Sequence, residues 1–462
     1  MMTLSEASEL VGGCLHGDGA LFESVSIDSR TLRPGELFVA IKGEYSNGHD
    51  FVASSAESGA AGAMVMTLQP APIPQIRVDD TTRSLGVLAR NWRERFTMPV
   101  VAITGSNGKT TVTRLVASIL SRMGKCLSPK KSFNNQWGVP LTLLGLRDTH
   151  RYAVIEMGTN GPGEIRYLSS LARPTIAIIN NVSPAHVAGL GDVEQISRAK
   201  SEIFSGMKES GTAIINLDDR FHSDWCRCFR SEVRQGTILT FGSSPQADVR
   251  HENPVVGWSG SEFDLHIGQD RAHVTLPLPG LHNISNATAS AAIAHAAGAD
   301  LGSIRRGLES VVGAPGRLRR VAGINGAEVI DDSYNANPRS IMAAIDVLAG
   351  FQGRKILVLG EMAELGVTGP EHHREVGAYA RKRRIDALYC LGEEHSKLSG
   401  FYVDGFGQGA GKSLDAESLI SRLRCDMDAN TAVLVKGSRS SRMERIVAGI
   451  ADEARNRVDS PC

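Results

Sequence analysis

The sequence predicts an α/β protein of three domains, and three observations lead to this expectation. First, 462 residues are too many for one hydrophobic core, so several domains of ordinary size are expected. Second, apolar strands alternate with helical stretches over most of the chain, which is typical of a mostly parallel sheet covered by helices. Third, one apolar strand runs into a Gly-rich turn and a helix, as in mononucleotide-binding domains.

The three expected domains are residues 1–82, residues 83–314 and residues 315–462. The first is a small α/β domain with short apolar runs, such as residues 37–41, broken by Gly and Pro. Residues 69–75 contain three prolines and are interpreted as a connector near the end of this domain.

The second expected domain contains the clearest alternation of strands and helices. Apolar strands are expected at residues 100–104, 153–157 and 175–180, each followed by a helical pattern. Residues 240–280 alternate apolar and polar side chains and favour strands, whereas the Ala-rich residues 286–297 favour a helix. This domain is therefore expected to be a P-loop-type α/β domain.

The third expected domain is smaller. Residues 355–359 and 432–435 are apolar runs of strand length, and helical stretches lie between them. The pattern predicts a Rossmann-like α/β domain.

Composition excludes several classes of protein. Hydrophobic residues make up 42% and charged residues 22%, as in a globular protein, and 50 basic residues balance 50 acidic ones. The balance disfavours a nucleic-acid binder, and no apolar run approaches the roughly 20 residues that span a bilayer. The N-terminus lacks the pattern of a signal peptide, and the seven scattered cysteines favour free thiols in a reducing compartment. We expect a cytoplasmic monomer without membrane insertion.

The strongest local motif begins at residue 104 and reads Thr-Gly-Ser-Asn-Gly-Lys-Thr-Thr. Such a loop directs backbone N–H groups and a helix N-terminus at phosphate. Lys109 would reach the terminal phosphates, and the Thr110 hydroxyl would bind Mg²⁺. The spacing between the glycines is shorter than in the strict P-loop pattern, so an ordinary Gly-rich turn is the alternative.

Three further residues are candidates for chemistry. Glu156 ends an apolar strand, at the edge where open α/β sheets bind ligands, and is a candidate Mg²⁺ ligand or a simple strand cap. His186 lies in a Gly- and Pro-containing loop after the next strand. It is either a metal ligand or a structural histidine. By composition alone, Lys200 is a solvated lysine on an amphipathic helix.

Taken together, these motifs resemble the Mur ligase family, which joins amino acids or peptides to a carboxylate at the expense of ATP. The family's further motifs follow in order: Gly-Leu-His-Asn-Ile-Ser-Asn at residues 280–286, Gly-Arg at 316–317 and Asp-Asp-Ser-Tyr-Asn-Ala-Asn-Pro at 331–338. The resemblance covers almost the whole chain.

The resemblance implies a set of roles. Lys109 and Mg²⁺ would offset charge on the transferring phosphoryl group, with Glu156, His186 and Thr110 as metal ligands and Lys200 as a metal-binding carbamate. The nucleotide would be held by Gly105, Ser106, Asn107, Gly108, Lys109, Thr110, Thr111, Asn283, Asn286, Arg317, Asp332 and Asn335. The other substrates would be bound by Ser29, Arg30, Asn134, Asn135, Lys436 and Arg439.

Other features resemble the family member that joins D-alanyl-D-alanine to UDP-N-acetylmuramoyl-tripeptide. They are Asp-Ser-Arg at residues 28–30, Ser-Phe-Asn-Asn at 132–135 and Gly-Glu-Met-Ala-Glu-Leu-Gly at 360–366. The resemblance implies these two substrates, ATP and an acyl-phosphate intermediate. The alternatives are another Mur-type or folylpolyglutamate-type ligase, a P-loop small-molecule kinase or NTPase, and a nucleotide-binding regulator without catalysis.

Overall fold

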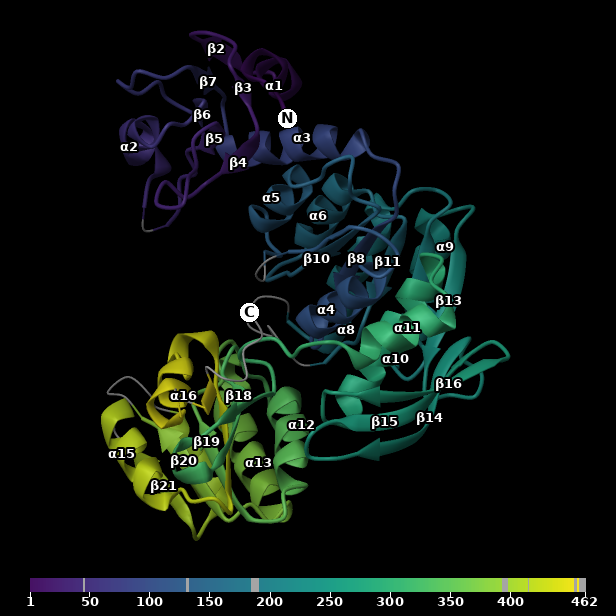
Figure 1. Cartoon of the computed structure of the whole chain (residues 1–462), viewed down its shortest axis with the longest axis vertical. Helices are drawn as coiled ribbons and strands as arrows, with labels where there is room; N and C mark the ends of the chain where they lie inside the picture. Colours follow the sequence, from purple (N-terminus) through teal and green to yellow (C-terminus); the bar gives the residue numbers. More distant parts are fainter. Residues whose placement is uncertain are drawn as a thin grey trace.

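A computed structural model describes residues 1–44, 46–129, 133–183, 191–392, 398–413, 415–452 and 455–456. Its strands form three separate larger sheets, which occupy three successive stretches of the chain. Figure 1 shows them as three bodies: the N-terminal one at the top, the central one below it and the C-terminal one at the bottom left. The expected architecture of three α/β domains is confirmed.

The first sheet has five strands in the order β2-β7-β6-β5-β4. A capping box between Thr3 and Glu6 begins α1, and Gly12, in the left-handed conformation, ends it. The connector expected at residues 69–75 is shorter than predicted, because Gln75 already belongs to β7. The elements are β1 (Met2–Thr3), α1 (Leu4–Val11), β2 (Cys14–His16), β3 (Leu21–Phe22), β4 (Ser24–Ser26), β5 (Glu36–Val39), η1 (Gly48–Phe51), α2 (Val52–Glu57), β6 (Gly62–Val65) and β7 (Gln75–Arg77).

Helix α3 (Thr81–Glu94) joins the first domain to the second and packs against α1, α5 (Gly138–Leu144) and α6 (Glu164–Ala172). Asp80 caps its N-terminus by accepting a hydrogen bond from the Arg83 N–H. Near its end the buried Arg93 guanidinium donates to the carbonyl oxygens of Ala172, at 2.9 Å, and Phe96, at 2.6 Å. The bond to Ala172 fixes the helix to the central domain, and both bonds supply the acceptors that a buried guanidinium must have.

The central sheet has nine strands in the order β16-β15-β14-β13-β12-β11-β8-β10-β9. The strands from β9 to β14 pair in parallel, and β14, β15 and β16 form an antiparallel extension. Its strands are β8 (Val100–Thr104), β9 (Cys126–Leu127), β10 (Tyr152–Glu156), β11 (Ile176–Ile179), β12 (Thr212–Asn216), β13 (Thr237–Gly242), β14 (Val249–Val256), β15 (Ser261–Ile267) and β16 (Asp270–Leu276). Its helices are α4 (Lys109–Leu120), α5 (Gly138–Leu144), α6 (Glu164–Ala172), α8 (Val193–Ser201), η2 (Glu202–Gly206), α9 (His222–Glu232), α10 (Leu281–Ala296) and α11 (Leu301–Glu309).

The third sheet has six strands in the order β17-β18-β22-β19-β20-β21, all parallel except β17. Hydrophobic clusters line both of its faces, as expected for parallel strands covered by helices. Its elements are β17 (Arg319–Ala322), η3 (Ile324–Gly326), β18 (Glu328–Asp332), α12 (Pro338–Ala349), β19 (Arg354–Leu359), η4 (Gly366–Thr368), α13 (Gly369–Lys382), β20 (Ala387–Leu391), α14 (Ser399–Phe406), β21 (Ala410–Ser413), α15 (Ala416–Asp426), β22 (Thr431–Lys436), η5 (Arg439–Ser441) and α16 (Glu444–Ile450).

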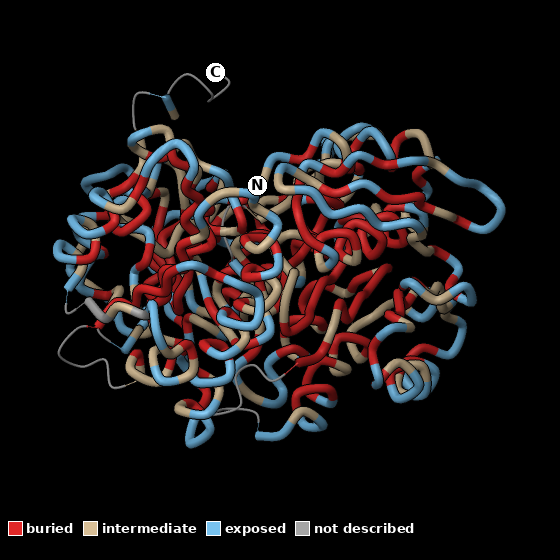
Figure 2. The backbone as a smooth tube through the Cα atoms, turned by 90° about the horizontal axis from the view of Figure 1, so that it is seen from below, coloured by how far each residue is buried: buried red, intermediate tan, exposed pale blue. Residues whose placement is uncertain are grey.

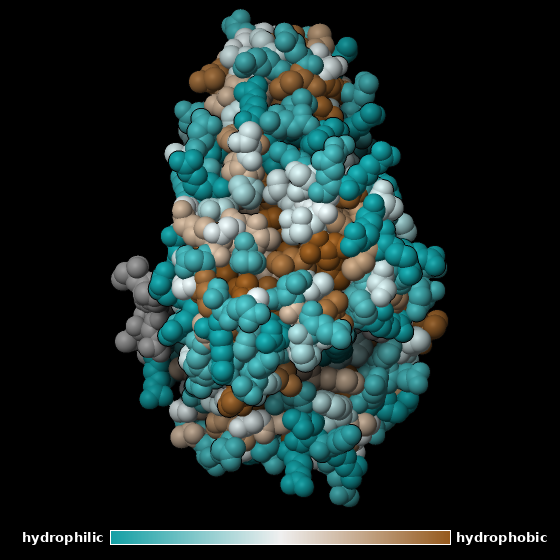
Figure 3. Space-filling model, turned by 90° about the vertical axis from the view of Figure 1, so that its right-hand side faces the viewer, coloured by the Kyte–Doolittle hydropathy of each residue, from teal (hydrophilic) through white to brown (hydrophobic). Residues whose placement is uncertain are grey.

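The apolar strands form the interior of the molecule. Buried segments run through its centre in Figure 2, and the exposed segments lie around them. On the face shown in Figure 3, hydrophilic side chains predominate and hydrophobic ones gather near mid-height. Within the described ranges, none of the helices has both the length and the apolar character that crossing a bilayer demands.

Close packing of α13 on α14 yields a testable prediction. A Cβ added at Gly405 would overlap the Arg374 carbonyl oxygen, whereas one added at Gly400, in the same helix, would meet nothing within 4 Å. Gly405→Ala should therefore lower the free energy of unfolding by about 1–3 kcal/mol, and Gly400→Ala should leave it unchanged or raise it by up to about 1 kcal/mol. Urea denaturation of the two variants measures the difference, and equal stabilities would contradict the packing.

Candidate active site

The turn after β8 has the geometry of a phosphate-binding loop. Gly108 has a φ of 80°, and a Cβ there would lie 2.6 Å from the Asn180 amide nitrogen, so only glycine fits without strain. No side chain caps α4, and among the described residues nothing accepts from the backbone N–H groups of Lys109, Thr110 and Thr111. Bare N–H groups at a helix N-terminus are the donors that a phosphate requires.

Lys109 lies over this turn. Its ammonium donates to the Gly105 carbonyl oxygen at 2.6 Å. Burial lowers the pKa of Lys109, and the nearby negative charge of Glu156 opposes this effect. The strongest motif of the sequence therefore folds as expected, with Lys109 and Glu156 brought together.

Glu156 ends β10, which pairs in parallel with β8. Its side chain is 2% exposed, and the Asn134 amide donates to its Oε1 at 2.8 Å. The Asn134 carbonyl oxygen in turn accepts from the Gly158 N–H at 2.8 Å. Asn134, expected to bind substrate, thus lies directly against the candidate metal ligand and holds it in place.

Lys200, on α8, is buried rather than solvated: the residue is 2% exposed. Burial lowers the pKa of Lys200 well below its ordinary value, and the positive charge of Lys109 adds to this effect. The interpretation from composition, a lysine on a solvated helix face, is therefore wrong. The sequence could not reveal this burial, because it results from the packing of α8 within the central domain.

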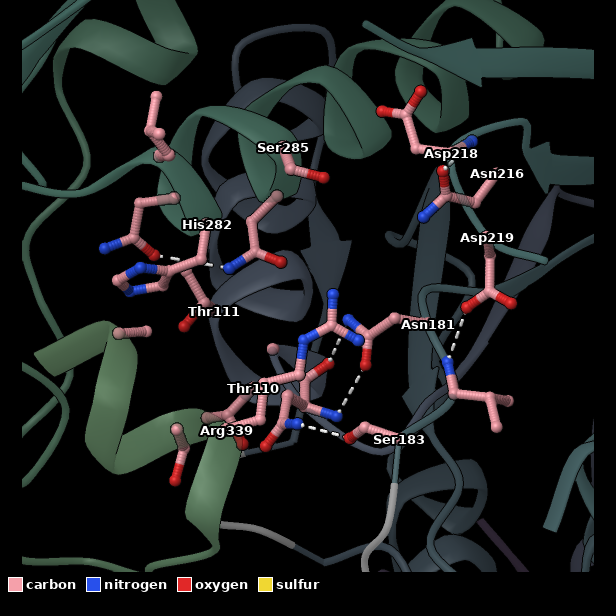
Figure 4. Close-up of a pocket in the computed structure, with 18 of the residues that line it drawn as sticks. Thr110, Thr111, Asn181, Ser183, Asn216, Asp218, Asp219, His282, Ser285 and Arg339 are labelled. Atoms are coloured by element: carbon pink, nitrogen blue, oxygen red, sulfur yellow. Dashed lines mark hydrogen bonds between the residues drawn. The ribbon is translucent and has the colours of Figure 1, made fainter. Parts of the chain in front are cut away.

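A cavity of about 780 Å³ lies between the second and third domains. Figure 4 shows side chains from the phosphate loop, from α10 and from the start of α12 around one space. Its volume is within the range of pockets that hold ligands of nucleotide size. The lining residues include Asn107, Gly108, Thr110, Thr111, Asn181, Ser183, Asn216, Asp218, Asp219, His282, Asn283, Asn286, Arg317, Asp332, Arg339 and Lys436.

Asn283 and Asn286, both predicted at the nucleotide site, line this cavity and also brace the loop. The Asn286 carboxamide oxygen accepts from the Asn180 amide at 2.9 Å, and its nitrogen donates to the Asn283 oxygen at 3.2 Å. The Asn180 amide also donates to the carbonyl oxygen of Asn107, at 3.0 Å. Helix α10 is thereby linked to the phosphate loop.

The third domain contributes the opposite wall. The Arg317 guanidinium lies 4.2 Å from the centre of the Tyr334 ring, which fixes its plane beside the cavity. The Lys436 ammonium donates to Asp332 Oδ2 at 2.6 Å and to the Asn335 carbonyl oxygen at 2.8 Å. The expectation that Lys436 serves the incoming dipeptide does not fit this position, because a buried ammonium needs the carboxylate that it has.

Several predicted residues lie away from the cavity. Ser29 and Arg30 are in the first domain, where the exposed Arg30 pairs with Asp28 at 2.8 Å. Asn135 accepts from the Trp137 and Gly138 N–H groups and shapes the turn before α5.

Arg439 and His186 are two further predicted site residues. Arg439, 64% exposed, pairs with Glu444 at 3.0 Å. His186 lies outside the described residues. The described ranges contain no group of three His, Cys, Asp or Glu side chains that could hold a metal.

Other cavity residues were not predicted from the sequence, namely Asn181, Ser183, Asn216, Asp218, Asp219, His282 and Arg339. One signal could have found Asn216: it ends β12, next to β11 in the parallel sheet, as Glu156 ends β10. Ligands bind at the carboxyl edge of such sheets, so each strand-end residue is a candidate.

Fold and site together define a three-domain nucleotide-binding protein, and comparison with known proteins gives its family. The Mur ligase middle domain matches residues 103–294, the Mur ligase glutamate ligase domain residues 316–439, and the Mur ligase family catalytic domain residues 22–93. The chain belongs to the Mur ligase family.

Relatives within the family match over nearly the full length. UDP-N-acetylmuramoyl-tripeptide–D-alanyl-D-alanine ligase of Escherichia coli K12 is 40% identical, covering 98% of each chain. A crystal structure of MurF from Acinetobacter baumannii matches with a TM-score of 0.89 at 34% identity, covering 97% of this chain and 98% of the other. The MurF ligase of Thermotoga maritima in complex with ADP matches with a TM-score of 0.80 at 27% identity, covering 94% of this chain and 98% of the other.

The cavity gives a prediction about pH. Burial, together with the positive charge of Lys436, lowers the pKa of His282 to about 4. Between pH 6.5 and 4 the unfolded chain therefore takes up a proton that the folded chain does not, and stability is lost as the pH falls. His282→Gln should reduce this loss by on the order of 2 kcal/mol at pH 4.5.

Thermal unfolding of both proteins from pH 7.5 to 4.5 measures the effect. His295→Gln, at an exposed position of the same helix, is the control and should follow the unsubstituted protein. Parallel curves for His282→Gln and the unsubstituted protein would contradict a neutral His282.

Proposed function

We propose that this protein joins D-alanyl-D-alanine to UDP-N-acetylmuramoyl-tripeptide at the expense of ATP, with release of ADP and phosphate. The observation that carries the proposal is the cavity between two domains, which has a bare phosphate-binding helix N-terminus on one wall and Arg317 on the other. The relative in Escherichia coli that bears this activity in its name is 40% identical over 98% of the chain.

ATP fits the donors that are present. The N–H groups of the first turn of α4 and the Lys109 ammonium suit the phosphates. Arg317 adds a planar cation from the third domain. The carboxamides of Asn283 and Asn286 supply neutral donors and acceptors along α10. A nucleotide in this cavity would touch both domains and would favour their closed arrangement.

Mg²⁺ fits the hard oxygen donors near the loop. We propose that Thr110 and Glu156 hold one ion together with nucleotide phosphate, and that His186 and a Lys200 carbamate hold a second. The ions would supply charge neutralisation for phosphoryl transfer. The low pKa of Lys200 supports its assignment, because only the neutral amine adds to CO₂.

The chain's own groups account for the chemistry as follows. Lys109 neutralises charge on the phosphoryl group, which passes to the tripeptide's terminal carboxylate to give an acyl phosphate. The amine nitrogen of the dipeptide attacks the carbonyl carbon of this acyl phosphate and loses a proton. The bond from that carbon to the phosphate oxygen breaks, so phosphate leaves as the amide forms. Asn134 keeps the Glu156 carboxylate oriented during these steps through its 2.8 Å hydrogen bond.

The two remaining substrates would approach from the other domains. We propose that Ser29 and Arg30 of the first domain, residues 1–82, bind the UDP-sugar, with Asn134 and Asn135 at its peptide end. In the third domain, residues 315–462, we propose that the exposed Arg439 and the loop at 360–366 receive the dipeptide carboxylate. The central domain, residues 83–314, carries the phosphate loop.

The deciding experiment measures phosphate release with UDP-N-acetylmuramoyl-tripeptide, with and without D-alanyl-D-alanine. Release should require both substrates, and Lys109→Ala should lower it by at least about 100-fold, because the loop loses its cation. Lys125→Ala, an exposed lysine in the same domain, is the control and should keep full activity. Phosphate release without either substrate would instead identify an NTPase.

The proposed role of Lys200 makes a separate prediction. Lys200→Ala should lower turnover about 10- to 100-fold while the protein still binds ATP, because a metal ligand is lost. Arg198→Ala, an exposed position of the same helix, is the control. Removing bicarbonate should slow the unsubstituted enzyme and adding it back should restore the rate. A fully active Lys200→Ala enzyme would exclude the carbamate.

A further inference from the structure

One hydrogen bond joins the third domain directly to the phosphate loop. Asn337, at the N-terminus of α12, donates from Nδ2 to Oδ1 of Asn107 at 2.7 Å. Asn107 lies between the two glycines of the loop, 230 residues earlier in the chain. The contact is therefore formed only when the third domain is seated on the second.

The direction of this bond follows from the helix cap. The Asn337 Oδ1 accepts from the Ser340 N–H at 2.9 Å, and a backbone N–H can only donate. The Asn337 Nδ2 atom must therefore face Asn107, which has to accept through Oδ1. This leaves Asn107 Nδ2 to donate, and it does so to the Ser183 hydroxyl at 2.9 Å.

Hydrogen bonds also hold the backbone of Asn107. Its N–H donates to Asn181 Oδ1 at 2.9 Å, and its carbonyl oxygen accepts from the amides of Asn180 at 3.0 Å and Asn181 at 3.1 Å. The Ser183 N–H donates to the Ser106 hydroxyl at 3.0 Å. Residues 180–183, which follow β11, and the phosphate loop thus form one network that ends at Asn337.

We propose that Asn337 is a positioning residue: through Asn107 it ties the docking of the third domain to the conformation of the phosphate loop and of residues 180–183. A helix cap alone would stabilise α12 and leave the loop unaffected. The bond instead makes the loop rigid in the docked state and looser when the third domain departs. Only the kinetic consequence rests on the proposed ligase function.

Asn337→Ser separates the two roles. Serine is a good N-cap, so α12 keeps its cap, but its shorter side chain cannot reach Asn107. Asn337→Thr is a second variant with the same property. Asp415→Ser, at the N-cap of α15 in the same domain, is the matched control for a changed cap remote from the cavity.

Hydrogen exchange of the intact protein, followed by mass spectrometry, tests the coupling without substrates. Loss of one hydrogen bond should speed exchange of residues 105–108 and 180–183 about three- to tenfold in Asn337→Ser and Asn337→Thr. Asp415→Ser should leave these segments unchanged. Unchanged exchange in both Asn337 variants would overturn the proposal, whether or not the protein is a ligase.

Kinetics supply the second arm, as a double-mutant cycle with Asn107→Ala. As a single substitution, Asn337→Ser should raise the KM for ATP about three- to tenfold. In a protein that already carries Asn107→Ala, it should raise this KM no further. If the increases in KM from the two substitutions were instead multiplicative, as for independent sites, Asn337 would act apart from Asn107 and the proposal would be overturned. If the unsubstituted protein consumed no ATP with the two substrates, the proposed function would fail, and the exchange result would still decide the role of Asn337.

Discussion

The site depends on one constraint: the first turn of α4 must keep its N–H groups free while the loop before it stays rigid. A loop whose N–H groups bonded to its own side chains would be rigid but unable to bind phosphate. Here the rigidity comes from carboxamides outside the loop, chiefly Asn180 and Asn181 at the end of β11 and Asn286 on α10. Amides are neutral, so they brace the loop without competing for a phosphate.

Three lysines in and near the site, Lys109, Lys200 and Lys436, differ in the partners of their ammonium groups. Lys436 has a carboxylate at 2.6 Å, and Lys109 lies near Glu156. Lys200 has no such partner among the described residues, and the positive Lys109 disfavours its charge. A buried amine is costly as a cation, and of these three lysines Lys200 is the one whose pKa falls well below its ordinary value.

The third domain completes the cavity rather than merely covering it. Arg317 and Asp332 line the same space as the phosphate loop, and Asn337 touches the loop itself. The third domain therefore contributes charge and shape to the site, and it contacts the phosphate loop directly. A movement of the third domain would therefore alter the cavity itself.

The sequence by itself determined the three α/β domains, the phosphate loop and the strand-end Glu156. These features are local, because periodicity, glycine spacing and a strand end are each set by neighbouring residues. The order of motifs also indicated the family. Helix α10 began five residues before the predicted 286–297, since the Ala-rich run marks only its interior.

Only the tertiary structure decided which polar residues are buried and with whom. Lys200 has the sequence pattern of a surface lysine, and Lys436 was expected to bind a substrate, but both are buried in the folded protein. The bond between Asn107 and Asn337 is equally invisible in the sequence, because it joins two domains. Burial and long-range pairing depend on packing between distant segments. That packing lowered the pKa of Lys200 and set the direction of the amide network.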